Sequence, residues 1–446
     1  MEGLIMAAQM LLGLSILIGL HELGHFVAAR VFKIRVSKFY LFFDFLFPMY
    51  NVMNFALFKF KKGDTEYGLG WFPFGGYVKI EGMVDESMDT EAMAKPPQPW
   101  EFRSKPAWQR LIVMMGGIIV NVITGIVIFI ALTYHYGEQY VTMNEVNKQG
   151  IVAYPLAEKM GLKTGDKILK VNQIVPEKFA DIYNPDVLLS DGSSYTIARG
   201  DSTMTIAIPN DLIGSLSKEK ERFVEPIFPY EIGALVAGSN AEKAGLKPKD
   251  KLATIDGEEV KYFHQLQAVL QKHKSSKVAI VVNRGGATLS LPTQVDENGK
   301  IGFQPSMLLA QSTKQFTFAE ATVKGTTNAF ALVFLNIKGL GKIFSGQIKA
   351  TDAVSGPIGM AKMFGGVWDW HNFWNMVGVI SMILAFMNFL PIPGLDGGYV
   401  LFLTYEMISG RKPSDKFMEY SLRFGMMIIL SLMVFSIGND VFKLFR

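Results

Sequence analysis

The 446-residue chain contains no cysteine, which excludes disulfide bonds and thiolate chemistry. It also has no block of basic residues, and its formal charge of +4 is small for this length, so nucleic-acid binding is not expected. Apolar residues are abundant instead and make up 49% of the chain. This composition indicates a membrane protein with more than one domain.

Four segments have the character of membrane spans, at about residues 4–31, 111–132, 373–403 and 421–438. The first is interpreted as a retained helix rather than a signal peptide, because no basic region precedes it. Lysine and arginine gather after the first span, before the second, and between the third and fourth. Because these residues favour the cytoplasmic side, the pattern predicts that both termini and the long insert of about 140–314 are external.

The insert contains an internal repeat, in which residues 157–173 and 241–257 agree at eight of seventeen positions without a gap. Each copy fits a short helix, a turn and a β-branched strand. The copies resemble two PDZ domains in tandem, at residues 140–225 and 226–311. Neither copy has a clean Gly-Leu-Gly-Phe loop, so ligand-binding modules and purely structural modules both stay open.

Residues 312–350 mix apolar and polar side chains. An interfacial amphipathic helix is favoured here over a fifth span, because five apolar residues can share one helical face. They are Phe318, Ala321, Ala329, Leu332 and Val333.

The first span carries His21-Glu22-Leu-Gly-His25, although ionisable residues inside a membrane span are costly and usually functional. On a helix, residues four apart lie on the same face, so both imidazoles can reach one metal ion. Glu22 lies beside them, placed to take a proton from the attacking water. A packed-core role is the ordinary interpretation of one helical histidine, but not of this triplet.

A catalytic zinc site usually has three protein ligands, so a third is expected on a neighbouring span. Asp396 is the only acidic residue between Asp369 and Glu406, and Pro391 and Pro393 open the backbone just before it. Alone, this aspartate could cap a helix. Together with the two histidines it is predicted to be the third ligand.

These motifs resemble the signature of site-2 proteases, which are zinc metalloproteases that cut within membranes. With the paired PDZ-like repeats, the chain is similar to the bacterial regulator-of-sigma-E branch of that family. The resemblance covers nearly the whole chain, with Ile118 standing where the family often has proline. It rests on the motifs His21-Glu22-x-x-His25, "FPFGGYVKIEGM" (residues 72–83), "FRSKPAWQR" before Gly117-x-x-x-Asn121, and Asn388-x-x-Pro-x-Pro-x-Leu-Asp396-Gly-Gly.

The resemblance implies that His21, His25 and Asp396 hold Zn²⁺ and that Glu22 activates water as the general base. Asn388 is expected to hydrogen-bond the substrate backbone or the developing oxyanion, with a helix-packing amide as the alternative. The substrates implied are single-span proteins in the bacterial inner membrane, such as anti-sigma factors after a first cut, or residual signal peptides. The PDZ-like modules would lie on the periplasmic side and the active site towards the cytoplasm.

Residues 65–80 alternate small and bulky groups, as a strand or re-entrant hairpin would. We expect this segment, with Gly68 and Gly70, to add a strand to the unwound substrate, whereas a plain cytoplasmic hairpin is the alternative.

The predicted fold is a polytopic α-helical membrane protein with an inserted pair of small β-rich (α+β) modules. Residues 1–139 and 351–446 form its membrane core. Two other classes stay open: a catalytically silent PDZ scaffold, and a proton- or metal-coupled transporter.

Overall fold

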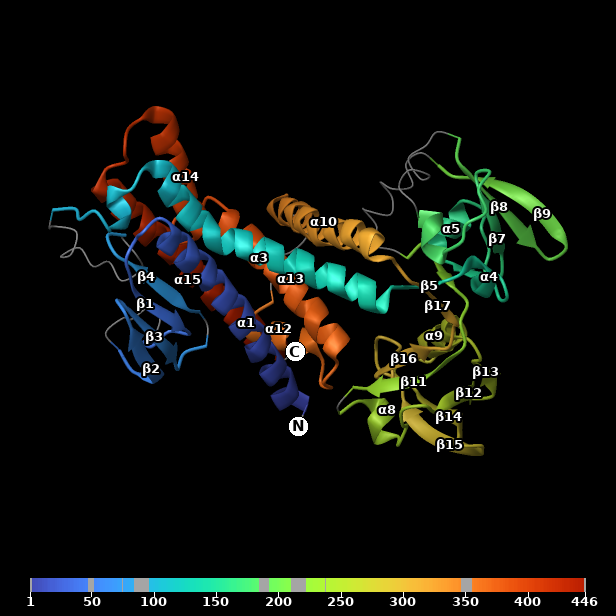
Figure 1. Cartoon of the computed structure of the whole chain (residues 1–446). Coiled ribbons are helices and arrows are strands. Elements are labelled where there is room, and N and C mark those ends of the chain that lie inside the picture. Colours follow the sequence, from blue (N-terminus) through green and yellow to red (C-terminus); the bar gives the residue numbers. More distant parts are fainter. Residues whose placement is uncertain are drawn as a thin grey trace. The chain divides into compact units, whose positions relative to one another are not determined.

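The computed structural model describes residues 2–46, 52–73, 75–83, 96–183, 192–209, 222–236, 238–345 and 355–444. The chain forms two compact units (Figure 1). One combines Met1–Gly137 with Gln315–Arg446, and the other is Glu138–Lys314. All the candidate site residues lie in the first unit.

The first unit is built mainly of helices, whose long apolar sequences favour this structure in lipid. They are α1 (Glu2–Val31), η1 (Phe102–Ser104), α3 (Ala107–Tyr136), α10 (Phe318–Phe344), α12 (Pro357–Phe364), α13 (Trp370–Phe389), α14 (Asp396–Ser409) and α15 (Asp415–Leu444). In the described part of the chain, four helices are long and apolar enough to cross a membrane. These are α1, α3, α13 and, within α15, Lys416–Phe442.

The third predicted span is broken into two helices. α13 ends at Phe389 and α14 begins at Asp396. The prediction of one span continuing to about residue 403 is therefore wrong, although the proline break itself was expected. Gly394, with φ +98°, takes a backbone conformation that side chains disfavour, and it completes the turn between the helices.

α1 and α3 approach so closely that their backbones touch. A Cβ atom on Gly24 would lie 2.3 Å from the carbonyl oxygen of Gly116, so no larger residue fits at this crossing. Small residues permit such close packing between helices in membranes. This contact fixes the position of α3 along α1, next to the histidine motif.

Two apolar clusters lie along this helix pair. One joins Met10 and Leu17 of α1 to Ile128 of α3 and Phe373 of α13. The other joins Ala29 and Val113 to the sheet, η1 and α14, through residues such as Ile80, Phe102 and Tyr399. His21 and Gly117 fall between these clusters in their helices, so the site is held by packing on both sides.

α10 begins with a capping box in which Thr317 and Glu320 satisfy each other's backbone N–H groups. Its Ala321 and Ala329 are fully buried, and Leu332 and Val333 pack partly buried beside Ala329. Phe318 on the same helix is 67% exposed. α10 is not among the helices apolar enough to span, and its interfacial position stays a prediction.

A four-stranded sheet follows α1, with the order β2-β3-β1-β4. Its strands are β1 (Val36–Leu41), β2 (Ala56–Lys62), β3 (Thr65–Gly70) and β4 (Tyr77–Ile80). β3 pairs with β2 on one edge and, in parallel, with β1 on the other. The expectation that this strand receives substrate is therefore wrong for β3, because both its edges are occupied. β4, which pairs with β1, is an edge strand.

Gly68 and Gly70 have packing roles inside this sheet. A Cβ atom on Gly68 would lie 2.2 Å from the ring of Tyr40, and one on Gly70 would lie 2.1 Å from the carbonyl oxygen of Phe43. Both positions therefore require glycine for reasons internal to the sheet.

The second unit contains two apolar cores, one formed by residues between Met143 and Val224 and one by residues between Phe228 and Ile301. The elements around the first are β5 (Glu138–Val141), α4 (Met143–Val146), β6 (Ile151–Ala153), α5 (Pro155–Lys159), β7 (Lys167–Val171), η2 (Phe179–Tyr183), β8 (Ser194–Arg199), β9 (Ser202–Ala207) and β10 (Val224–Pro226). Those around the second are β11 (Tyr230–Leu235), α8 (Asn240–Lys243), β12 (Lys251–Ile255), β13 (Glu258–Glu259), α9 (Phe263–Lys272), β14 (Lys277–Arg284), β15 (Ala287–Gln294) and β16 (Phe303–Met307). The last strand, β17 (Gln311–Lys314), pairs with β5. The resemblance of these modules to PDZ domains stays a prediction.

The sequence repeat reappears as a repeated ion pair. Arg199 donates to both carboxylate oxygens of Asp166 at 2.7 Å, and Arg284 does the same to Asp250 at 2.7 and 2.6 Å. Each aspartate is 1% exposed. Hydrogen bonds from the Arg284 guanidinium lower the pKa of Asp250, because they favour the charged carboxylate.

Candidate metal centre

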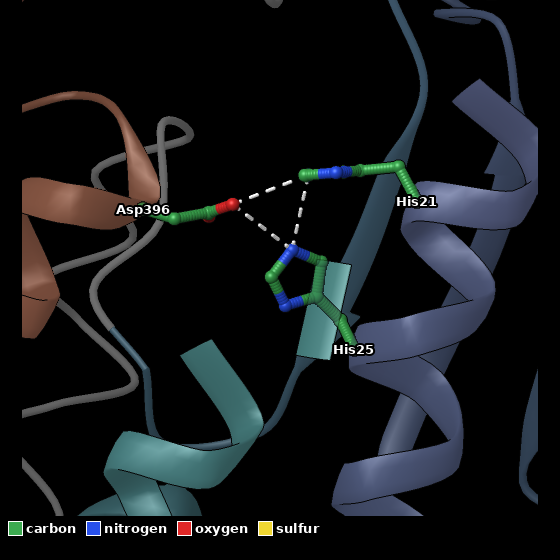
Figure 2. Close-up of side chains that lie close together, drawn as sticks. All are labelled: His21, His25 and Asp396. Carbon is green, nitrogen blue, oxygen red and sulfur yellow. Dashed lines mark hydrogen bonds and ion pairs between the residues drawn. The ribbon is translucent and has the colours of Figure 1, made fainter. Parts of the chain in front are cut away.

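His21 and His25 project from the same face of α1, one helical turn apart, as their spacing predicts. Their Nε2 atoms lie 3.2 Å from each other. Asp396 reaches them from the first turn of α14, and its Oδ2 lies 3.2 Å from Nε2 of His21 and 3.3 Å from Nε2 of His25 (Figure 2). Segments 371 residues apart in the chain therefore bring three ligand atoms to one point.

This triad fits a zinc ion. Ligands about 2.0–2.1 Å from a tetrahedral zinc lie about 3.3 Å from one another, close to the three separations found here. Asp396 Oδ2 is buried and has no hydrogen-bond partner in the described residues, as expected of an atom that faces a cation. Two imidazoles and one carboxylate also leave a fourth position for water. Among the described residues, this is the one group of at least three such side chains arranged to hold a metal.

The two histidines are supported from α3. His25 Nδ1 lies 2.8 Å from the carbonyl oxygen of Val113, which can only accept a hydrogen bond. Nδ1 therefore carries the proton, and Nε2 keeps its lone pair for a metal. His21 Nδ1 contacts the side-chain amide of Asn121 at 3.1 Å.

Gly117 forms the floor of the site. A Cβ atom at this position would lie 2.5 Å from His21 Cε1 and 2.5 Å from His25 Nε2. The rings therefore rest directly on the backbone of α3. This role of Gly117 was not predicted from the sequence, although the Gly117-x-x-x-Asn121 spacing, which puts both residues on one face of a helix, was the available signal.

Glu22 lies beside the triad without belonging to it. The turn into β4 passes over it, since a Cβ atom on Gly76 would lie 3.4 Å from Glu22 Cγ and 2.8 Å from a methyl group of Ile18. No hydrogen bond to the Glu22 carboxylate comes from the described residues. The edge strand β4 is thereby brought next to the carboxylate that the sequence predicts to be the base.

Asn388 also lies at the site. Its Nδ2 is 3.5 Å from His21 Nε2, which is too long for a strong hydrogen bond but places the amide next to the open side of the triad. The structure thus brings together His21, Glu22, His25, Asn388 and Asp396. It does not bring Gly68 or Gly70 to them.

Two histidines and an aspartate, of which His25 is buried and the other two are partly buried, have the donor set of a metalloprotease, with a glutamate between the histidines. The histidines and the glutamate lie on α1, a helix able to span a membrane, and Asp396 begins α14, which follows a second such helix, α13. The fold and site therefore define the class of membrane-embedded metalloproteases.

Comparisons with known proteins agree with this class. The sequence model of peptidase family M50 matches residues 9–432. The regulator of sigma-E protease RseP of Escherichia coli is 27% identical over 473 residues, which cover 98% of this chain and 98% of that protein. RseP of Salmonella typhimurium is 27% identical over 474 residues with the same coverage. A Neisseria meningitidis protein named as a proposed zinc metalloprotease is 26% identical over 458 residues, or 96% of this chain and 97% of that protein.

The chain belongs to peptidase family M50, the site-2 protease family, and is a zinc metalloprotease. The family resemblance and the zinc dependence expected from the sequence are thereby confirmed.

Proposed function

We propose that this protein hydrolyses peptide bonds within the transmembrane segments of single-span membrane proteins. The observation that carries the proposal is the depth of the triad. His21 lies about 28 Å from the start of α1, a helix of 30 residues, and about 15 Å from its end. A water-dependent reaction centre at that depth suits substrates that are themselves in the membrane.

The ligands in this proposal are His21, His25 and Asp396. When bound there, zinc polarises the scissile carbonyl and lowers the pKa of water to about 7. A carboxylate oxygen of Glu22 takes the proton from the attacking water and passes it to the departing amine. Asn388 is placed to donate from Nδ2 to the developing oxyanion or to the substrate backbone.

We place the protein in the bacterial inner membrane with the site towards the cytoplasm. Arg30 lies in the last turn of α1, and Lys33 and Arg35 follow it. Arg103 and Lys105 precede α3, so both helices have basic residues at the same end. The module pair Glu138–Lys314 is then periplasmic. In that position it can act as a gate that excludes substrates with bulky outer domains, and peptide or protein ligands of the modules remain part of the proposal.

Substrate binding is proposed at the edge of β4. A helical segment hides its peptide bonds, so it must unwind before cleavage, and an edge strand can hold the extended chain by main-chain hydrogen bonds. β4 offers such an edge beside Glu22. Val78→Pro and Lys79→Pro should each be assayed, since backbone N–H groups of a strand point alternately to its two sides. At least one should slow cleavage, whereas Phe58→Pro and Lys59→Pro in β2, the opposite edge, should not.

The physiological substrates proposed are anti-sigma factors trimmed by a first protease, and residual signal peptides. The name of two relatives, regulator of sigma-E protease, supports the first class. Purified protein and Glu22→Gln should be compared in detergent for cleavage of a single-span model substrate and for bound zinc. Zinc in both, with cleavage by the parent alone, is expected. Cleavage by Glu22→Gln at the parent's rate would refute the role of the glutamate.

A further inference from the structure

Asn121 is a buried amide that touches a metal ligand. It lies on α3 one turn beyond Gly117 and has no exposed surface. Its Nδ2 is 3.1 Å from Nδ1 of His21, the ring nitrogen that faces away from the triad. His21 and Asn121 therefore form a contact between α1 and α3 directly behind the site.

The other end of the same amide is unsatisfied. Asn121 Oδ1 is buried and has no hydrogen-bond partner among the described residues. An unpaired buried acceptor costs about 1–3 kcal/mol, so a fully buried asparagine whose side-chain oxygen has no hydrogen-bond partner needs an explanation. Rotating the amide by 180° exchanges Oδ1 and Nδ2 with almost no change of shape, and it brings an acceptor to the histidine.

The chemistry of the ligand requires that acceptor. A histidine that binds a metal through Nε2 carries its proton on Nδ1, and a proton there needs a partner that accepts. An amide that presents Nδ2–H to Nδ1 stabilises the opposite tautomer, with the proton on Nε2, which cannot bind a metal. His25 already has the required partner in the carbonyl oxygen of Val113.

We infer that Asn121 is a positioning residue for the zinc site, an inference that rests on the proposed ligation by His21. In the zinc-bound enzyme its side-chain carbonyl accepts the Nδ1–H of His21, which fixes the ring's tautomer and its direction. Both histidines are then held from α3, one by a main-chain carbonyl and one by an amide carbonyl.

The position of Asn121 is secured from a third helix. Ser381 of α13 is fully buried, and its hydroxyl donates to the backbone carbonyl oxygen of Asn121 at 2.7 Å. This bond involves the backbone of Asn121 and leaves its amide free to face His21. Ser381 is therefore a natural control, because it contacts the same residue but not the ligand.

The test compares Asn121→Leu, Asn121→Asp and Ser381→Ala in the full-length protein in detergent. Zinc affinity is measured by competition with a chelator, with no substrate present, and thermal unfolding is measured on the metal-free samples. Asn121→Leu keeps the size but loses the acceptor, so zinc should bind about 10–100-fold more weakly. Asn121→Asp keeps an acceptor and has no donor, so its affinity should stay within about threefold of the parent or become tighter.

Ser381→Ala should leave zinc affinity unchanged even if the unfolding temperature falls. The absorption spectrum of bound Co²⁺ should change in Asn121→Leu and be restored in Asn121→Asp, which a packing role alone does not predict. Affinity as weak in Asn121→Asp as in Asn121→Leu would overturn the inference, because the amide would then act as a donor. Parent-like zinc affinity in Asn121→Leu would also overturn the inference. If the leucine variant fails to fold, zinc affinity clearly weakened in the aspartate variant still overturns the inference.

His21→Leu separates this inference from the proposal on which it rests. Unchanged zinc affinity in His21→Leu would remove that histidine from the ligand set. Loss of zinc there, combined with parent-like binding in Asn121→Leu, would reject the role of Asn121 only.

Discussion

Replacing Gly117 by alanine should remove zinc from this enzyme without unfolding it. The new methyl group would lie 2.5 Å from His21 Cε1, 2.5 Å from His25 Nε2 and 2.7 Å from His21 Nε2. Non-bonded atoms of these kinds reach their optimal separation at about 3.5–4.0 Å, so the rings and the methyl group must separate by about 1 Å.

The zinc site does not tolerate a movement of that size. Metal–ligand distances hold to within about 0.2 Å, so two ligands displaced by about 1 Å cannot both bind. Alanine favours a helix over glycine by about 1 kcal/mol, so α3 itself should not be weakened. We expect zinc affinity to fall at least about 100-fold, the upper end of the effect of a residue that only supports a ligand. Cleavage should be lost with it.

Gly125→Ala is the matched control, because it makes the same change two turns further along α3. Its methyl group would meet Sδ of Met382 at 2.5 Å and Cγ at 2.8 Å, atoms of a flexible side chain that can rotate away. Zinc per chain and chelator competition should be measured for both variants, with circular dichroism to confirm folding. Parent-like zinc affinity in folded Gly117→Ala would refute the reasoning, since the rings would then not rest on the α3 backbone.

Three further predictions concern stability and the metal. Arg110, at the start of α3, is 7% exposed and pairs with Glu406 of α14, 18% exposed, at 2.5 Å. Arg110→Met should cost about 3 kcal/mol by leaving this partly buried carboxylate without its partner, and adding Glu406→Met should restore most of that stability, both measured by thermal unfolding. Arg284 lowers the pKa of Asp250 in the folded module. The Asp250 carboxylate therefore stabilises the module fully at pH values above about 4, the pKa of aspartate in the unfolded chain. This stabilisation is lost as the pH falls through the lower pKa of the folded state. Asp250→Asn should therefore speed hydrogen exchange in β12 at pH 7 and converge with the parent near pH 2; a difference that grows at low pH would contradict the sign. Chelation should abolish cleavage and added zinc should restore it, and cleavage that survives complete zinc removal would contradict the assigned chemistry.

The parts of the site that could be predicted from the sequence are those that depend on local geometry. His21 and His25 share a face because residues four apart on any helix do so. Asp396 could be predicted because two prolines open the backbone before an isolated acidic residue. Its pairing with the histidines came from the expected ligand count and from the family resemblance.

Other features depend on which elements become neighbours. β3 was expected to offer an edge to substrate, but β1 lies between it and β4, and no local pattern encodes that order. Phe318 shares the apolar stripe of α10 with Ala329, yet Phe318 is exposed and Ala329 is buried, because the helix approaches α3 most closely at Gly325.

The sequence by itself therefore determined the family and predicted the donors, the base and the spans, which follow from residue type and from spacing within separate segments. Only the tertiary structure decided how that chemistry is held. The floor at Gly117, the amide of Asn121 behind His21 and the placement of β4 over Glu22 arise where separate segments meet. Contacts of this kind depend on packing at the ångström scale, and spacing along the chain does not specify it.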